Sequence, residues 1–258
     1  MNKTARKIIM IIAAFVFLFS GAMLLNYCFE LRSGADFSES ITEMAVAENF
    51  EHEITGEETN GAQEFLEKSE TAPIKVDFDL LRAQNEDVIA WIYCPDTPIN
   101  YPIVQSSNNE HYLRRLLDGS YNISGTLFMD FRNSADFSDW NSIIYGHNIK
   151  NDSMFGTLPL YEEQSYFDEH PVMYLLTPEK DYKINILSGF VTLSDAEFYN
   201  ALNPGEEEKA EFIKSWLGAS DFDSEAETGP ESRFITLSTC SYDYSEARYV
   251  IIGILEEL

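Results

Sequence analysis

The stretch TLSTCSYDYSEARYVIIGIL, residues 236–255, holds two apolar runs on either side of a short polar segment. Phe234–Thr239 and Tyr249–Leu255 are rich in β-branched and other apolar residues, which favour strands, and the segment between them is short enough for an antiparallel turn. The pattern therefore predicts two paired strands, with Cys240 at the end of the first and Arg248 at the start of the second.

The ends of these strands carry side chains suited to acyl transfer. A cysteine is nucleophilic as its thiolate and needs positive charge or a histidine nearby. An arginine is always charged, and its donors suit a developing oxyanion. His147 follows the β-type run Ser142–Tyr145, with Gly146 leaving room beside it. The sequence therefore predicts that Cys240, His147 and Arg248 form one catalytic site.

Each of these three residues also has a plainer interpretation. Cys240 can be interpreted as a buried structural cysteine and His147 as a surface-loop histidine. Arg248 can be interpreted as a strand-edge arginine paired with Glu246. The polar neighbours of Cys240 favour exposure of its thiol. A free thiol outside the cell is also a liability unless it is used, which favours a functional role. Cys94, which ends an apparent strand, is interpreted as a small, partly buried residue.

Composition narrows the class of protein. The chain has 258 residues, of which 45% are hydrophobic, so there is ample material for a buried core. Lys and Arg number 17 against 44 Asp and Glu, and the net charge of −27 argues against nucleic acid as a partner. Three cysteines do not make a disulfide framework. The sequence has no calcium-loop spacing, phosphate loop or dinucleotide fingerprint, so neither a metal nor a cofactor is expected.

The N-terminus contains an uncharged run, Ile8–Phe29, preceded by three basic residues. Its 22 residues span roughly 33 Å as a helix, against about 30 Å for a bilayer core. The basic flank predicts a cytoplasmic N-terminus and an extracellular domain. A cleaved signal peptide is the alternative, but we favour an uncleaved single-pass anchor in the cell membrane over residues 1–29. Residues 30–72 are acidic and predict a solvated extracellular stalk, with Ile41, Met44, Ala47 and Phe50 at helical spacing.

Residues 73–258 predict one mainly β domain. Eight short strand-like runs separated by turn residues favour a closed or nearly closed barrel, namely Ala90–Tyr93, Tyr101–Val104, Gly125–Met129, Ser142–Tyr145, Val172–Leu176, Tyr182–Leu193, Phe234–Thr239 and Tyr249–Leu255. Helices are expected after Asp77 or Asp79 and at Glu110–Leu117, Met154–Leu160 and Glu206–Leu217.

These motifs resemble those of the sortases, the cysteine transpeptidases of Gram-positive cell walls. The resemblance rests on TLSTC, on an arginine eight residues after its cysteine, and on YGHN about ninety residues earlier. The segments Asn85–Arg114 and Gly125–Tyr161 look like the opening and central parts of a class B catalytic domain. The resemblance runs from roughly Val76 to Leu255.

The resemblance implies a closed eight-stranded sortase-type β-barrel with peripheral helices. These include an N-terminal helix and a helix inserted before the cysteine-bearing strand, which helps form the substrate groove. It also implies that Cys240 cleaves a C-terminal sorting signal of the Asn/Ser/Pro-Pro-x-Thr type after threonine, through a thioacyl intermediate. Arg248 then stabilises the oxyanion and His147 transfers the proton. The acceptor is an amine of a peptidoglycan cross-bridge or of lipid II, and the partners are surface proteins bearing the sorting motif.

Three further residues enter by resemblance alone. Ser238, Tyr145 and Asn109 resemble substrate-binding residues of the class B family, although each is equally interpretable as a packing or turn residue. A pilin-polymerising sortase, which uses a pilin lysine as nucleophile, is the second hypothesis. The Asp-Pro-aromatic lid motif common in polymerising class C enzymes does not occur in Glu30–Thr71. A non-catalytic surface scaffold on a sortase fold is the third, and the intact cysteine, histidine and arginine argue against it.

Overall fold

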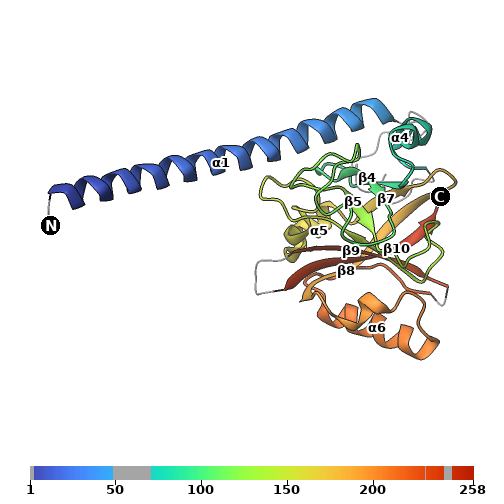
Figure 1. Ribbon diagram of the computed structural model, residues 1–258. Coiled ribbons are helices and arrows are strands. Elements are labelled where there is room, and N and C mark those ends of the chain that lie inside the picture. Colours follow the sequence, from blue (N-terminus) through green and yellow to red (C-terminus); the bar gives the residue numbers. More distant parts are fainter. Residues whose placement is uncertain (1–2, 49–70, 230, 241–245) are drawn as a thin grey trace.

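Eight strands close into a β-barrel in the order β10-β8-β7-β3-β4-β5-β6-β9 (Figure 1). The structure, a computed structural model, describes residues 3–48, 71–229, 231–240 and 246–258, and the side chains of Lys3, Ala5 and Cys240 lie outside that description. The strands are β3 Val88–Tyr93, β4 Asn100–Val104, β5 Leu127–Met129, β6 Asn141–Tyr145, β7 Val172–Leu176, β8 Asp181–Leu193, β9 Arg233–Cys240 and β10 Ala247–Glu257. This confirms the closed eight-stranded barrel expected from the sequence.

Two of the strand pairs that close the barrel are parallel. β4 runs parallel to β5 and β6 runs parallel to β9, whereas the other neighbours are antiparallel. The chain therefore crosses over before β5 and again before β9. The second crossover contains the insertion between β8 and β9, which carries the 3₁₀ helix η2 (Glu197–Asn200) and the helix α6 (Glu206–Ala219).

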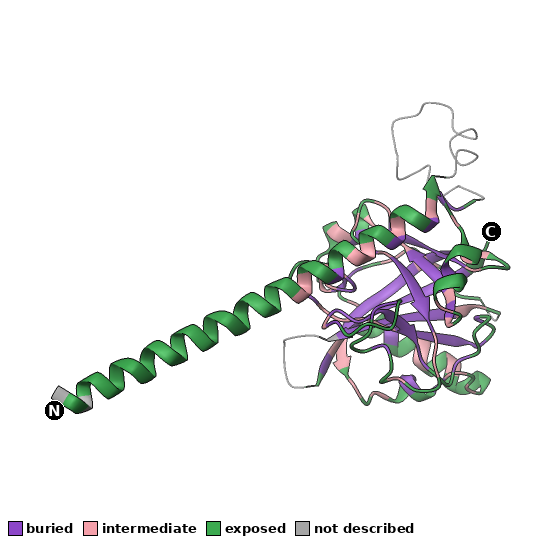
Figure 2. Cartoon of the chain, turned by 45° about the horizontal axis from the view of Figure 1, so that its top comes forward, coloured by how far each residue is buried: buried purple, intermediate pink, exposed green. Residues whose placement is uncertain are grey.

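The barrel is apolar on both faces along β10. Tyr249 and Ile251 belong to a buried cluster to which all eight barrel strands contribute. Val250 and Ile252, which alternate with them, belong to a second cluster that includes Trp216 of α6. Successive side chains of a strand point to opposite faces, so β10 packs on the barrel interior with one face and on the cluster that contains Trp216 of α6 with the other. The barrel strands are accordingly coloured as buried in Figure 2.

Two of the expected helices, the one near the start of the domain and the one inserted before β9, are present. α4 (Phe78–Gln84) begins after Asp77, whose carboxylate accepts a hydrogen bond from the backbone NH of Leu80 at 3.0 Å. α6 confirms the helix expected at Glu206–Leu217, and its buried Trp216 stacks on Trp140 at 5.3 Å between ring centroids. The expectation for Met154–Leu160 is met only in part, because the 3₁₀ helix η1 (Leu158–Glu162) begins near its end and α5 (Gln164–Glu169) follows.

The helix expected at Glu110–Leu117 is wrong. This segment is a series of turns, because its backbone carbonyls are used by residues further along the chain. The carbonyl of Tyr112 accepts from the NH of Thr126 and that of Arg114 accepts from the NH of Asn122, each at 3.1 Å. A helix would need those carbonyls for its own amide groups four residues on.

A single long helix, α1 (Lys3–Ala45), projects from the barrel (Figure 1). Between Arg6 and Ala45 it is long and apolar enough, by length and composition, to cross a membrane. Its N-terminal half is exposed where described and points away from the barrel (Figure 2). This is the apolar run on which the predicted anchor rests.

The C-terminal end of α1 packs on the barrel. The side-chain amide of Asn122 donates to the carbonyl of Glu30 at 2.9 Å, so contact with the barrel begins at the first residue after the apolar run. Ile41 and Ala45 are buried in a cluster with residues of α4, β3 and β4. Over residues 30–45 the segment predicted as a solvated stalk is therefore helix packed on the domain, because these apolar side chains are buried there.

A two-stranded sheet follows α1. β1 (Val46–Glu48) pairs antiparallel with β2 (Ile74–Val76), a contact that sequence analysis did not predict. Of the other residues predicted at helical spacing, Met44 and Ala47 are exposed and Phe50 lies outside the described residues, as do residues 49–70. The domain boundary at residue 73 stays a prediction.

Candidate active site

Three neighbouring strand ends meet on one side of the barrel. β6 and β9 are parallel with Tyr145 beside Ser238, and β9 and β10 are antiparallel with Cys240 opposite Arg248. His147 lies two residues beyond Tyr145, and Cys240 lies two residues beyond Ser238. The register therefore brings the backbones of the three predicted catalytic residues to the same level of adjacent strands.

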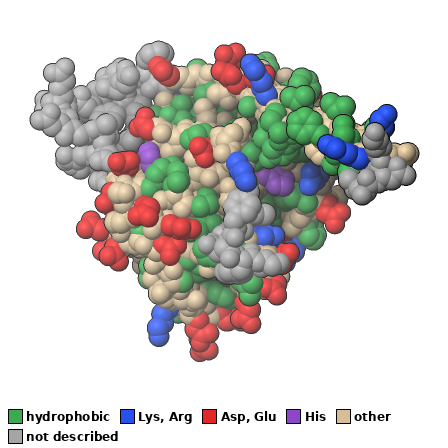
Figure 3. Space-filling model, turned by 90° about the vertical axis from the view of Figure 1, so that its left-hand side faces the viewer, with side chains coloured by type: hydrophobic (Ala, Val, Ile, Leu, Met, Phe, Trp, Pro, Cys, Tyr) green, Lys and Arg blue, Asp and Glu red, His purple; other side chains and the backbone are tan. Residues whose placement is uncertain are grey.

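A pocket of about 220 Å³ opens at these strand ends. Five of the six predicted site residues line it, namely Asn109, Tyr145, His147, Ser238 and Arg248. The sixth, Cys240, ends β9 directly after Thr239, which also lines the pocket, and the Cys240 side chain lies outside the described part of the chain. On the face drawn in Figure 3, acidic side chains gather along the left and lower edges.

Gly146 lets β6 continue into the pocket. Its backbone NH donates to the carbonyl of Ser238 at 3.1 Å, which extends the β6–β9 pairing by one residue toward His147. A Cβ atom at this position would lie 2.6 Å from the ring of Phe155 and would also collide with Leu127. The glycine is therefore required by close packing beside His147.

The imidazole of His147 is held by a backbone carbonyl. Its Nε2 lies 2.6 Å from the carbonyl oxygen of Leu113. Because a carbonyl only accepts, Nε2 donates, and the neutral ring then leaves Nδ1 free to take a proton. Leu113 lies in the segment wrongly expected to be helical, where this carbonyl would have been bonded within the helix. The turn conformation makes the contact available.

The guanidinium of Arg248 is part of the pocket wall. Its side chain is 27% exposed, and Nη1 donates to the carbonyl of Ala247 at 3.0 Å. The pairing with Glu246 that the plainer interpretation requires is present, but its N–O distance is 3.9 Å and the Glu246 side chain is 70% exposed. Exposed ion pairs of this kind contribute about 1 kcal/mol at most, so they do not explain the position of the arginine.

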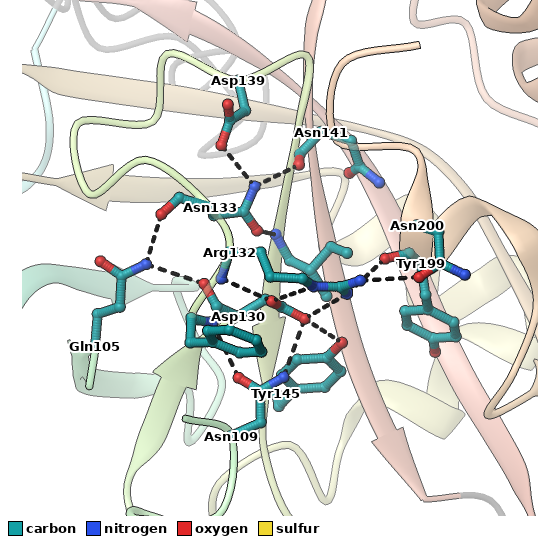
Figure 4. Close-up of polar contacts among 12 residues, drawn as sticks. Gln105, Asn109, Asp130, Arg132, Asn133, Asp139, Asn141, Tyr145, Tyr199 and Asn200 are labelled. Carbon is teal, nitrogen blue, oxygen red and sulfur yellow. Dashed lines mark hydrogen bonds and ion pairs between the residues drawn. The ribbon is translucent and has the colours of Figure 1, made fainter. Parts of the chain in front are cut away.

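The three predicted substrate-binding residues belong to a polar network, of which Figure 4 shows the part around Tyr145 and Asn109. Tyr145 donates its hydroxyl to Asp130 at 3.0 Å, and Asn109 donates its amide to the same carboxylate oxygen at 3.1 Å. Ser238 is 2% exposed, and its hydroxyl lies 2.7 Å from that of Tyr199. These three side chains are therefore held by neighbours before any ligand is present.

Sequence analysis missed Tyr199 and Asp130. Tyr199 lines the pocket from η2, and its ring stacks on that of Tyr145 at 6.2 Å between centroids. Asp130 follows β5 directly and is fully buried. The available signal was an aspartate at the end of an apolar run with an arginine, Arg132, two residues later. No motif links Tyr199 to the pocket, because only the fold brings η2 there.

The two described thiols, those of Cys28 and Cys94, lie outside this pocket. Cys94 is fully buried, and burial raises the pKa of its thiol to about 11. Cys28 is exposed on α1. Within the described residues no group of three or more His, Cys, Asp and Glu side chains could hold a metal ion.

Comparison with known proteins gives the family. Sortase B of Listeria monocytogenes is 33% identical over 175 residues, which cover 67% of this chain and 71% of that protein. Sortase B of Staphylococcus aureus is 28% identical over 182 residues, covering 70% and 75% respectively. The structure of Bacillus anthracis sortase B in complex with AAEK1 superposes with a TM-score of 0.71 at 26% identity, covering 89% of this chain and 99% of that one. No protein-family model matches the chain. On the strength of the L. monocytogenes relative and of the shared barrel, the chain belongs to the sortase B family of transpeptidases.

Proposed function

We propose that this protein is a membrane-anchored cysteine transpeptidase that cleaves sorting signals of the Asn/Ser/Pro-Pro-x-Thr type after threonine. The observation that carries the proposal is the register of three strand ends. This register sets Cys240 opposite Arg248 and level with His147. Arg248 and His147 both line the pocket at these strand ends. A nucleophile, a proton-transfer group and a fixed cation are the parts that acyl transfer needs.

The first half of the reaction forms a thioester. His147 takes the thiol proton of Cys240 at Nδ1, and the resulting thiolate attacks the threonine carbonyl. The electron pair of the C=O bond moves to the oxygen, which Arg248 stabilises. As the oxyanion collapses, the C–N bond breaks and His147 gives its proton to the leaving amine. The cleaved C-terminal segment leaves with that amine.

The second half transfers the acyl group. An acceptor amine attacks the thioester carbonyl, and His147 takes the proton that the amine loses. The C–S bond then breaks, which regenerates the thiolate and forms a new amide. The hydrogen bond from Nε2 to the carbonyl of Leu113 supports Nδ1 as the atom of His147 that carries the shuttled proton.

Two solved relatives support the classes of substrate and acceptor. One structure is a complex of S. aureus sortase B with its substrate, and another sortase B structure holds triglycine. This peptide supplies a primary amine of the kind that ends a peptidoglycan cross-bridge. We therefore assign surface proteins bearing a C-terminal sorting motif as donors and a cross-bridge or lipid II amine as acceptor.

The membrane part of the proposal rests on α1. Its apolar stretch is long enough to cross a bilayer, and three basic residues precede it. Positive charge is retained on the cytoplasmic side, so we assign a cytoplasmic N-terminus and an extracellular barrel.

The function is tested with fluorogenic Asn-Pro-x-Thr peptides and the purified full-length protein. We expect cleavage, an acyl adduct on Cys240 detectable by mass spectrometry, and transfer of that acyl group to triglycine. Cys240→Ala should abolish all three, whereas Cys94→Ala should cleave normally. Transfer to a lysine-containing pilin peptide but not to triglycine would favour the pilin-polymerising alternative, and full activity of Cys240→Ala would exclude the mechanism.

A further inference from the structure

Asp130 is a fully buried carboxylate at the centre of the polar network behind the pocket (Figure 4). One of its oxygens accepts from the backbone NH and the Nε of Arg132 at 3.0 and 2.8 Å. The other accepts from Nη2 of Arg132 at 2.8 Å, from Asn109 at 3.1 Å and from the hydroxyl of Tyr145 at 3.0 Å. Each of these donors to the carboxylate is therefore either Arg132 or a residue that lines the pocket.

Asn109 is held at both ends of its amide. Its nitrogen donates to Asp130, and its oxygen accepts from the backbone NH of Phe131 at 2.9 Å. The orientation of the amide is thereby fixed by the loop that follows β5. Only the second N–H and the second lone pair remain for a ligand.

Arg132 reaches the opposite wall of the pocket. Its Nη2 donates to the carbonyl of Tyr199, and its Nη1 donates to the side-chain oxygen of Asn200, both at 2.8 Å. Both acceptors belong to η2 in the insertion between β8 and β9. Tyr199 in turn stacks on Tyr145 and shares a hydrogen bond with Ser238. A single ion pair thus joins the β5 loop, β6 and the insertion.

The charged state of this aspartate is secured by its surroundings. Burial alone would raise the pKa of Asp130, but hydrogen bonds from Arg132 and Asn109 outweigh it and hold the pKa below its usual range. A buried ion pair is weak evidence for a stabilising role, since an apolar pair of similar volume is often as stable. A positional role is better supported, because the donors are pocket residues.

We propose that Asp130, braced by Arg132, is a positioning residue that sets Tyr145, Asn109 and Tyr199 in the shape that receives the sorting peptide. This proposal rests on the proposed function, since it assigns the same pocket to peptide binding. Asp130 itself does not touch the reacting atoms. Its loss should therefore weaken peptide binding while leaving the chemistry at the cysteine largely intact.

The test compares conservative variants of the protein in detergent. Asp130→Asn replaces one acceptor oxygen by an NH₂ that faces donors, so we expect the KM for an Asn-Pro-x-Thr peptide to rise roughly tenfold or more, with a smaller change in kcat. Arg132→Lys keeps the charge but loses the fork that holds η2. It should raise KM by roughly threefold, an intermediate effect.

Asp139→Asn is the matched control. Asp139 is also a buried carboxylate of the same loop, and it accepts from Asn133, from the NH of Ser134 and from Asn203 of the insertion. None of these partners lines the pocket. We expect a lower melting temperature for this variant and a KM within about twofold of the wild type.

Two more measurements separate positioning from general damage. The reaction of Cys240 with a small methanethiosulfonate reagent needs no peptide groove, so its rate should stay within about twofold in Asp130→Asn. The double variant Asp130→Asn/Tyr145→Phe should lose no more peptide affinity than Asp130→Asn alone, since both remove the same contact.

The outcomes discriminate between the two proposals. An Asp130→Asn or Arg132→Lys protein with wild-type KM, alongside an inactive Cys240→Ala, would overturn the positioning role and leave the proposed function intact. Activity in Cys240→Ala would overturn the proposed function first. If Asp130→Asn does not fold, Arg132→Lys and Tyr145→Phe still decide, because unchanged KM in both contradicts the proposal.

Discussion

Arg248 lies directly opposite Cys240 in the antiparallel pairing of β9 with β10. The carboxylate of Glu246 is 3.9 Å from its guanidinium and largely exposed. The position of the guanidinium is therefore determined by strand register and not by a surface ion pair. A catalytic and a structural role for Arg248 therefore predict different effects of Arg248 and Glu246 substitutions on kcat and on the melting temperature.

Arg248→Ala should lower kcat far more than it raises KM. A donor to the oxyanion acts mainly in the transition state, and removing one costs on the order of a hundredfold to a thousandfold in rate. Arg248→Lys should recover only part of this loss, because lysine keeps the charge without the planar fork. Steady-state kinetics with the fluorogenic peptide gives both parameters.

Glu246→Ala is the control for the arginine variants. A structural pair predicts that this change would mimic Arg248→Ala and that both would chiefly lower the melting temperature. We expect instead a nearly unchanged kcat for Glu246→Ala and a stability within about 0.5 kcal/mol of the wild type. A stable Arg248→Ala enzyme with near-normal kcat would end the oxyanion assignment.

Cys94 should be inert toward thiol reagents in the folded protein. It is fully buried, and its pKa of about 11 leaves almost no thiolate at neutral pH. Iodoacetamide labelling followed by peptide mass spectrometry should modify Cys94 only after unfolding. Rapid native labelling of Cys94 at pH 7 would contradict its burial.

Gly146→Ala should impair both packing and catalysis. The added methyl group would press on the ring of Phe155 and on Leu127, and the relief of that clash moves the strand that carries His147. Overpacking of this kind costs typically about 1–3 kcal/mol. Thermal unfolding and kcat are the measurements, and Gly218→Ala, at a glycine with open space around it, is the control.

Asp130 should make stability sensitive to acid. Its folded-state pKa lies below the value of 3.8 expected for a free aspartate, so its stabilising contribution is present above that value and is lost as the pH falls through the folded pKa. The difference in unfolding free energy between wild type and Asp130→Asn should therefore be constant from about pH 8 to about pH 5 and shrink below about pH 4. Urea titrations across this range measure it, and a difference that grows in acid would reverse the sign.

Ile41→Ala should destabilise the domain without altering the chemistry. Ile41 is 3% exposed in the cluster between α1 and the barrel, and truncation of such a side chain costs typically about 2–5 kcal/mol. No described residue of α1 lines the catalytic pocket, so kcat should be unchanged. Glu43→Ala, at the exposed neighbouring position, should leave the melting temperature within about 1 °C. Equal melting temperatures for all three proteins would show that α1 does not pack on the barrel.

The barrel was predictable because each strand is an apolar run bounded by turn residues, and that pattern does not depend on distant partners. The failure at Glu110–Leu117 has the opposite cause, since the carbonyls of Tyr112 and Arg114 are taken by Thr126 and Asn122. Apolar residues at helical spacing contain no information about such long-range competition.

The site was predictable as far as its motifs extend. TLSTC and YGHN identify residues at strand ends, and the register of β6, β9 and β10 brings those ends together. The hydrogen bond between Ser238 and Tyr199 joins residues 39 positions apart, and that between Arg132 and Tyr199 joins residues 67 apart. Contacts of this kind arise from tertiary folding, so neither spacing nor composition indicates them.

The unbroken course of α1 has a consequence for where the enzyme can work. The helix passes from its apolar run into contact with the barrel at Glu30 without a flexible joint among the described residues. If the apolar run is embedded in a bilayer as proposed, this contact would hold the barrel close to the lipid surface. Under the proposed anchoring, donor and acceptor would then meet close to the membrane surface.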